Sequence, residues 1–305
     1  MSSGMFMVTT PHRTTSILQR LTALGVGVAA TLGLQAIATL LAPPAAQAQY
    51  IITLPDGVRC EGQFQGYTGN GICQYPDGYY RGDILNGRRH GSGIFYYYDE
   101  EEADNGDEDS NFRTIYNGEF LNGVPHGKGK FVYGNDNRYQ GDVRNGLPNG
   151  IGLFIFRDNR YYGEVLDGQP SGRGSMVYRN CRNYDGDVRC YRYDGLFQNG
   201  APHGQGTFTY NSCAQQNGQL QCTRFSGNFW RGQPNGSGNL SFPDGTRCQG
   251  QFNDVTLSGQ GSCFFGNGDN YTGELRLGAP HGVGRMRYAD GRVYEGQFRL
   301  GEPAP

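Results

Sequence analysis

Glycines recur at fixed intervals along most of this chain, and that interval constrains the fold more than any other feature of the sequence. Counted from Gly141, further glycines follow after 5, 9 and 11 residues, and six other copies keep these offsets. The commonest spacing between copies is 23 residues. A period of this length predicts a tandem array of one small supersecondary unit. The first glycines of the copies are Gly62, Gly82, Gly118, Gly141, Gly163, Gly195, Gly227, Gly250, Gly273 and Gly296.

Residues around these glycines alternate between apolar and polar with a period of two, which is typical of a half-buried strand. In one copy Tyr116 and Phe120 flank the first glycine and Phe131 follows the last one, whereas Lys128 and Lys130 occupy alternating positions. One face of each strand is therefore expected to be aromatic and the other to face water. Each unit is predicted to be an antiparallel β-hairpin, and neighbouring hairpins are predicted to extend one all-β sheet.

The composition agrees with short strands and tight turns, and it excludes one class of partner. The chain has 51 glycines without a collagen period, 21 tyrosines and 17 phenylalanines. After residue 48 it carries 24 Lys and Arg against 28 Asp and Glu, and eight of these acids fall at 99–109. Because no strong basic field is present, the sequence predicts no nucleic acid partner.

The first 48 residues have the three parts of a secretory signal peptide. Two arginines precede an uncharged stretch at 21–42, and small residues follow at Ala46 and Ala48. We therefore predict cleavage between Ala48 and Gln49, and export to the periplasm or the extracellular space. The alternative is an uncleaved membrane anchor, because about 22 apolar residues can span a bilayer. All eight cysteines follow residue 48, and an even number fits an oxidising compartment.

The tandem pattern Y-x-G-x-x-x-x-G-x-x-x-G-x-G, followed by an aromatic strand and often by Asp-Gly, resembles the MORN (membrane occupation and recognition nexus) repeat. The resemblance covers 58–305 as nine complete units and a final half, after a short lead-in at 49–57. Longer connections predict hairpin extensions at 98–112, 179–191 and 211–223. The resemblance implies an elongated, twisted antiparallel sheet that mediates protein assembly or contacts membranes and phosphoinositides. MORN arrays also accompany lipid kinases and lysine methyltransferases, but no block outside the repeats is long enough for such a catalytic domain.

The register of the repeat predicts four disulfides. Cys60 and Cys73 replace residues that face each other across the hairpin in other units, and Cys248 and Cys263 make the same double replacement. Two cysteines on one face of facing strands are expected to bridge. In two longer connections the cysteines lie nine residues apart around a glycine, where they would staple an extended hairpin near its base. The predicted bonds are Cys60–Cys73, Cys181–Cys190, Cys213–Cys222 and Cys248–Cys263.

Histidines and acidic residues do not form a recognisable catalytic or metal-binding motif. All histidines after residue 48 lie eight residues beyond the first glycine of a unit, where other units have Asn or Ser, so they are expected to fill turns. Neither zinc-ligand spacing nor a phosphate-binding loop is present. The acidic run 99–109 does not meet the EF-hand template and is interpreted as a solvated loop, with weak calcium binding as the alternative. We expect no cofactor, no metal and no enzymatic activity. The histidines are His90, His126, His203 and His281.

One aromatic residue per unit forms a row with two interpretations. We expect each ring to pack on the glycines of the next unit as part of the core. The alternative is an open groove whose rings stack on a sugar, a peptide or another ligand. The row consists of Tyr80, Tyr116, Tyr139, Tyr161, Tyr193, Phe225, Tyr271 and Tyr294.

The sequence thus favours a non-catalytic scaffold that binds protein partners through its repeat surface in an extracytoplasmic compartment. The alternative is a module that binds carbohydrate, cell wall or membrane lipid through the aromatic groove. Because lysines are so few, little attraction to anionic lipid is expected.

Overall fold

The computed structural model describes residues 50–98, 112–157, 159–253 and 258–304. The predicted signal peptide and the acidic run lie outside these described residues, as does most of the predicted extension at 98–112. The described part contains no helix, and hence none that is long and apolar enough to cross a membrane. Its strands are β1 (Tyr50–Thr53), β2 (Arg59–Gln65), β3 (Thr68–Tyr75), β4 (Gly78–Leu85), β5 (Arg88–Tyr98), β6 (Phe112–Leu121), β7 (Val124–Tyr133), β8 (Arg138–Arg144), β9 (Leu147–Phe156), β10 (Asn159–Leu166), β11 (Gln169–Tyr184), β12 (Asp187–Gln198), β13 (Ala201–Gln216), β14 (Gln219–Trp230), β15 (Gln233–Ser241), β16 (Arg247–Phe252), β17 (Gly259–Phe264), β18 (Asn270–Arg276), β19 (Ala279–Arg287), β20 (Val293–Arg299) and β21 (Glu302–Pro303).

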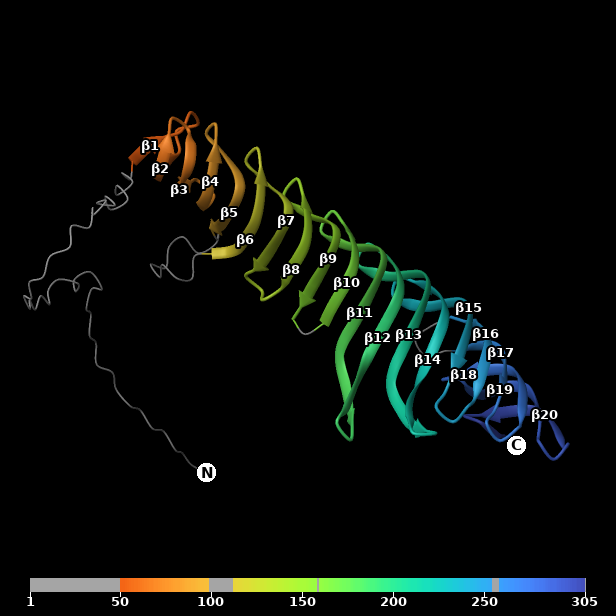
Figure 1. Ribbon diagram of the computed structural model, residues 1–305. Helices are drawn as coiled ribbons and strands as arrows, with labels where there is room; N and C mark the ends of the chain where they lie inside the picture. Colours follow the sequence, from red (N-terminus) through yellow and green to blue (C-terminus); the bar gives the residue numbers. More distant parts are fainter. Residues whose placement is uncertain (1–49, 99–111, 158, 254–257, 305) are drawn as a thin grey trace, which may run out of the picture. The chain divides into compact units, whose positions relative to one another are not determined.

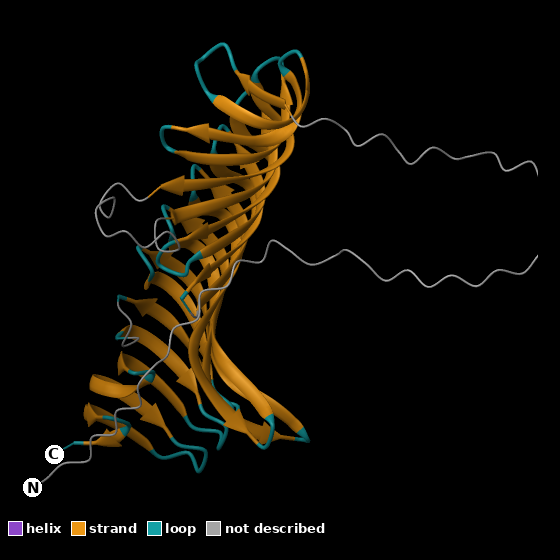
Figure 2. Ribbon diagram, turned by 90° about the vertical axis from the view of Figure 1, so that its left-hand side faces the viewer, coloured by secondary structure: helices purple, strands orange, loops and turns teal. Residues whose placement is uncertain are grey.

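All 21 described strands belong to one open sheet. Each strand pairs antiparallel with the strands before and after it in the chain, so the order in space is the order in the sequence (Figure 1). The sheet twists along its length, as Figure 2 shows. These observations confirm the prediction of an all-β array of tandem hairpins. β1 lies in the segment expected to be a lead-in, 49–57, and adds an edge strand to the first hairpin.

The repeated glycines face one another across the sheet. Gly141 in β8 pairs with Gly129 in β7 and with Gly152 in β9. The same alignment continues from Gly62 in β2 to Gly296 in β20. An ideal Cβ atom on Gly141 would lie 2.5 Å from the Cα atom of Gly152, closer than a real side chain can approach. The glycine row therefore fixes the strand register, because a slipped strand would bring a side chain into this contact.

Two-residue turns close the hairpins and tie each hairpin to its neighbour. Between β8 and β9, Asn145 and Gly146 have φ of 51° and 84°, the left-handed region that a type I′ turn requires. Gly146 also donates its amide to the carbonyl of Pro125 in the preceding hairpin, over 2.9 Å. Equivalent bonds join the later hairpins. Each of these turns thus reverses the chain within its own hairpin and also holds that hairpin against the preceding one.

Two adjacent hairpins, β11–β12 and β13–β14, are longer than the others and carry the predicted extensions at 179–191 and 211–223 (Figure 1). They meet at Tyr184, whose hydroxyl donates to the carbonyl of Asn211 over 2.5 Å and accepts from the amide of Cys213 over 3.0 Å. The extensions are therefore held side by side by a buried polar contact.

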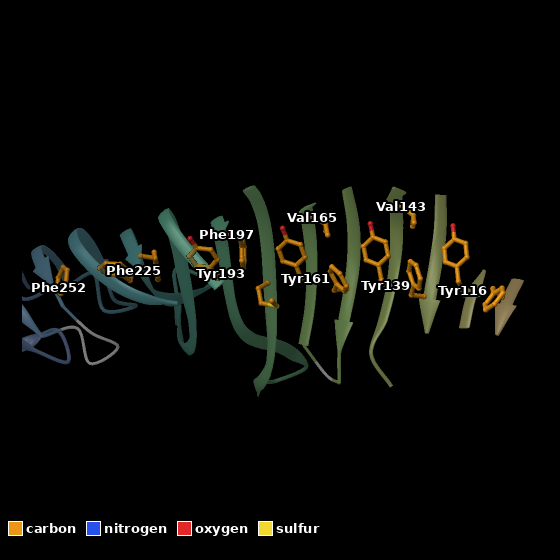
Figure 3. Packing of buried hydrophobic residues seen from close by; sticks show 14 of the residues in the cluster. Tyr116, Tyr139, Val143, Tyr161, Val165, Tyr193, Phe197, Phe225 and Phe252 are labelled. Carbon is orange, nitrogen blue, oxygen red and sulfur yellow. The ribbon is translucent and has the colours of Figure 1, made fainter. Parts of the chain in front are cut away.

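Among the described residues no second layer packs on the sheet, so its apolar face is covered by its own side chains. Along this face the aromatic residue before each first glycine alternates with an apolar residue after it (Figure 3). Phe197 stands edge-on between Tyr161 and Tyr193, with ring centroids 4.8 and 5.1 Å away. Such contacts join the buried residues into one cluster. The core is thus a continuous band shared by all the hairpins.

Candidate functional site

The aromatic row predicted from the sequence lies in this core. Each ring lies over the glycines of its own hairpin: an ideal Cβ atom on Gly152 would be 2.3 Å from the Tyr139 ring. The expectation that the rings pack on the glycines of the next unit is therefore wrong, because a strand side chain leans along its own strand. Buried rings offer no face on which a ligand could stack. Six of the row are 0% exposed, Tyr271 is 1% exposed and Tyr294 is half-buried; the six are Tyr80, Tyr116, Tyr139, Tyr161, Tyr193 and Phe225.

The tyrosine hydroxyls of the row donate hydrogen bonds to backbone carbonyls. Tyr139 donates to the carbonyl of Asp142 and Tyr161 to that of Glu164, both over 2.6 Å. Burial raises the pKa of Tyr161 and of Tyr193 to about 12. These hydroxyls are structural donors that stay protonated at neutral pH. The same bond is made by Tyr80, Tyr116, Tyr193, Tyr271 and Tyr294.

The acidic residue that follows the first glycine in many units also has a structural partner. Glu164 accepts a hydrogen bond from the amide of Arg173 over 3.1 Å, and Asp142 accepts one from Ile151 over 2.8 Å. Three other units repeat this bond. Hydrogen bonds from the Lys128 side chain and the Ile151 amide lower the pKa of Asp142. Each carboxylate thus satisfies an amide where the strand register shifts, and none stands out as a catalytic acid.

The expectation that the histidines fill turns is wrong: each lies within a strand, next to the point where the strand register shifts, because the turn itself is only two residues long. The carbonyl of His126 accepts a 3.2 Å hydrogen bond from the Tyr116 hydroxyl, and the carbonyls of His90 and His281 accept from the tyrosines of their own units. His203 packs on Trp230 with ring centroids 4.7 Å apart. Within 50–98, 112–157, 159–253 and 258–304, no three His, Cys, Asp or Glu residues are placed to hold a metal ion.

The cysteines lie in pairs at disulfide distance, in the pairing that the repeat register predicts. Cys60 and Cys73 are buried and face each other between β2 and β3, where other units have an aromatic contact. The pairs in the long hairpins instead fasten the strands of the extensions. S–S distances are 2.06 Å for Cys60–Cys73, 1.99 Å for Cys181–Cys190, 1.99 Å for Cys213–Cys222 and 1.98 Å for Cys248–Cys263.

The polar face of the sheet carries shallow hollows over the glycine row. One of about 540 Å³ lies between β12 and β15 and is floored by Gly195, Gly206, Gly227 and Gly238. Another, of about 760 Å³, lies between β6 and β10 over equivalent glycines. The glycine positions point to the opposite face, where the aromatic rings cover them, so on the polar face the neighbouring rows of side chains stand as walls above a floor of backbone. Sequence periodicity identifies these polar positions, but only the register shows that they line up beside the glycines.

The walls of these hollows change character along the chain. Between β6 and β10 they include charged and apolar residues such as Lys128, Lys130 and Ile151. From β13 to β18 one wall is an uninterrupted row of Ser, Thr, Asn and Gln. A surface of this kind offers donors and acceptors to an extended ligand that lies across the strands. The row consists of Thr207, Ser226, Asn239, Gln249, Ser262 and Thr272, each paired with the next.

Comparison with protein families identifies the repeat. The model of the MORN repeat matches eight segments, whereas the sequence count predicts nine complete units and a half. The unit that begins at Cys248 is not matched, and it has valine at position 255 where most units have a turn glycine. In the structure this unit keeps the glycine register, with Gly250 paired to Gly261. The matched segments are 60–78, 80–101, 116–138, 139–159, 161–180, 193–212, 225–247 and 271–291.

No curated protein matches the chain in sequence. Among solved structures, the TCP10 domain of Danio rerio CPAP is similar with 14% identity and a TM-score of 0.36, covering 82% of this chain and 100% of that one. The SAS-4 TCP domain of Drosophila melanogaster, solved with a proline-rich motif of Ana2, has 10% identity and a TM-score of 0.22, covering 84% and 94%. Scores this low support no inference about what this chain binds.

Proposed function

Because the chain belongs to the MORN repeat family, whose repeats are generally non-catalytic, we propose that it is a scaffold that binds protein partners in an extracytoplasmic compartment. The observation that carries this proposal is an apolar ridge along the turn edge of the sheet. The buried aromatic row gives no support to the alternative of a carbohydrate or lipid module that stacks ligands on those rings.

The apolar ridge consists of exposed residues beside four of the hairpin turns on one edge of the sheet. Leu121 and Val124 face each other next to the turn between β6 and β7. Leu147, Leu166 and Trp230 lie at the turn ends of β9, β10 and β14. All five are between 42% and 56% exposed. Single exposed apolar residues are ordinary, but their recurrence on one edge favours a protein interface.

The compartment is proposed from the cysteines and the N-terminal sequence. Four disulfides are typical of proteins that fold in an oxidising environment. The pattern at 1–48, which lies outside the described residues, supplies a route of export through a signal peptide or an anchor. We expect the native protein to begin at Gln49 with its cysteines oxidised, as intact mass and peptide mapping under non-reducing conditions would show. A chain that retained 1–48 with free thiols would overturn this part of the proposal.

Protein binding is tested with two matched variants in the native host. The ridge variant carries Leu121→Gln, Leu147→Gln and Leu166→Gln. The control makes the same change at three exposed valines away from the ridge, Val188, Val283 and Val293. Cross-linking and mass spectrometry should show partners retained by the control and lost by the ridge variant. Equal recovery of the same partners with both variants would exclude the ridge as the interface.

A further inference from the structure

A line of arginines crosses the polar face of the sheet beside the row of uncharged residues. The arginines come from every second strand between β8 and β16. They lie in direct register, since neighbouring arginines pair with the same residue on the strand between them: Arg224 and Arg247 both pair with Ser241. At two strands per step, successive arginines are roughly 10 Å apart and the whole line is about 38 Å long. The line consists of Arg138, Arg160, Arg192, Arg224 and Arg247, with Ile155, Val177, Thr209 and Ser241 between them.

Most of these guanidinium groups are available to an external anion. All five arginines are exposed. Arg192 forms an exposed ion pair with Asp194, at 2.7 Å. Among the described residues, no carboxylate forms an ion pair with the other four arginines. Because the residues between them are also uncharged, the line presents positive charge at regular intervals.

From β13 to β16 the uncharged row lies two positions away from the arginine line on each strand. A hollow of about 530 Å³ lies between the two rows and is lined by Arg247, Ser241, Asn239 and Gln249. Phe264, 53% exposed, lines the same hollow next to Arg247. Charged donors, neutral hydrogen-bonding groups and one apolar ring therefore face a single shallow channel across the strands.

We infer that this surface, from β10 to β17, binds a linear acidic polysaccharide. Its carboxylate or sulfate groups pair with the arginine line, since a guanidinium donates two parallel hydrogen bonds to such an anion. Its hydroxyl groups exchange hydrogen bonds with the uncharged row, and the Phe264 ring covers the apolar face of one sugar. The site lies on the opposite face from the buried aromatic row, and it does not depend on the protein partners proposed above.

Two other anionic partners fit this surface less well. A nucleic acid presents a phosphate about every 3.4 Å along each strand, so most phosphates would miss arginines spaced roughly 10 Å apart. A flat membrane cannot follow a sheet whose strands turn by about 20° each, and only a few arginines would reach it at once. A flexible polysaccharide can follow the twist and place a charge at each arginine.

The test measures binding of the oxidised protein, residues 49–305, to immobilised polygalacturonate and to dextran sulfate, with unmodified dextran as the uncharged control. Binding to at least one charged polymer is expected, and it should weaken as sodium chloride is raised. Arg160→Gln, Arg224→Gln and Arg247→Gln together should lower the affinity about tenfold or more. A matched variant that changes Arg144, Arg276 and Arg299 to Gln removes the same charge at the turn ends of β8, β18 and β20, and it should keep the affinity within about twofold.

A second pair of substitutions tests the uncharged row without altering charge. Asn239→Ala with Gln249→Ala should weaken polysaccharide binding by about threefold or more, because each lost amide removes hydrogen bonds to sugar hydroxyls. Circular dichroism should show that every variant stays folded, since all these positions are exposed or half-buried. Failure to bind either charged polymer, or unchanged binding after the triple substitution, would overturn the inference. Tighter binding to phosphatidylglycerol vesicles or to a single-stranded oligonucleotide would assign the arginines to a membrane or to nucleic acid instead.

Discussion

At the scale of single residues, the contact between a tyrosine ring and two glycines is the basic unit of this fold. Tyr139 lies over Gly141 and Gly152, with its hydroxyl on a carbonyl of its own strand. The contact buries a large ring on a one-layer sheet, which would otherwise leave one ring face in water. The glycines are needed here for the space above them, since neither has the positive φ that would itself favour glycine.

Alanine at Gly152 should therefore destabilise the protein more than a substitution at a turn glycine. The added Cβ atom would meet the Tyr139 ring, and we expect the free energy of unfolding to fall by about 1–3 kcal/mol. Gly146→Asn is the control, because nothing lies within 4 Å of that site and asparagine accepts a positive φ. Urea denaturation of both variants measures the difference. Equal losses would mean that backbone freedom, and not ring packing, selects glycine at Gly152.

The same buried tyrosines should make the fold sensitive to alkali. Burial raises the pKa of Tyr161 and Tyr193 to about 12, against about 10 in an unfolded chain. Their contribution to stability is complete below pH 10 and is lost as the pH rises from 10 to 12, because the unfolded chain ionises first. The melting temperature should therefore fall across this window, and Tyr161→Phe should make the fall shallower.

At the scale of the hairpin, a carboxylate in five units stabilises the point where the strand register shifts. Glu164 accepts the amide of Arg173, whereas the equivalent position in the β12–β13 hairpin is Leu196. The hairpins therefore differ in local stability although their strand pairing is the same. The disulfides also act at this scale, since each joins two strands of one hairpin.

Exchanging these two residues tests the role of the carboxylate. Glu164→Leu should lower the free energy of unfolding by about 1 kcal/mol, because it leaves the Arg173 amide without its acceptor. Leu196→Glu should slow hydrogen exchange at the amide of Gln205, the residue equivalent to Arg173. Hydrogen exchange followed by mass spectrometry reports both sites. Unchanged exchange at both amides in the two variants would argue against this role.

At the scale of the whole sheet, each strand forms its backbone pairing only with the strands before and after it in the chain. The strand order has no crossover, and the glycine alignment is the same at each pairing from β2 to β20. Stability is then close to a sum over units and their interfaces, as in other repeat proteins. A unit should therefore be removable as long as the alignment is kept.

Deletion of residues 141–162, one complete period, should leave a folded protein. Gly129 in β7 would then pair with Gly163 of β10 instead of Gly141. Gly163 pairs with the last glycine of its own unit, Gly174, just as Gly141 pairs with Gly152. Deletion of 141–151 removes a single strand and breaks the antiparallel alternation, so that chain should misfold locally. Thermal unfolding followed by circular dichroism distinguishes the two: a small shift is expected for the first deletion and a broad, early transition for the second. If the chain lacking 141–151 unfolded cooperatively at the melting temperature of the unmodified protein, the dependence of the fold on whole repeats would be contradicted.

The sequence by itself determined the repeat, the hairpins, the apolar and polar faces of each strand and the pairing of the cysteines. All of these are local or periodic, so spacing and period-two alternation are enough to predict them. For the aromatic row the sequence predicts packing on glycines but not on the right ones, because it places a tyrosine on a face without showing what lies beside it.

Only the tertiary structure decided that the rings lie on their own glycines, that the recurrent acids bond to backbone amides, and that Arg138 to Arg247 form one line. These features depend on strand register, which brings residues such as Arg160 and Val177, distant in the sequence, to within a strand spacing of about 4.8 Å. A single repeat fixes which face a residue occupies. The stacking of repeats decides which residues become neighbours there.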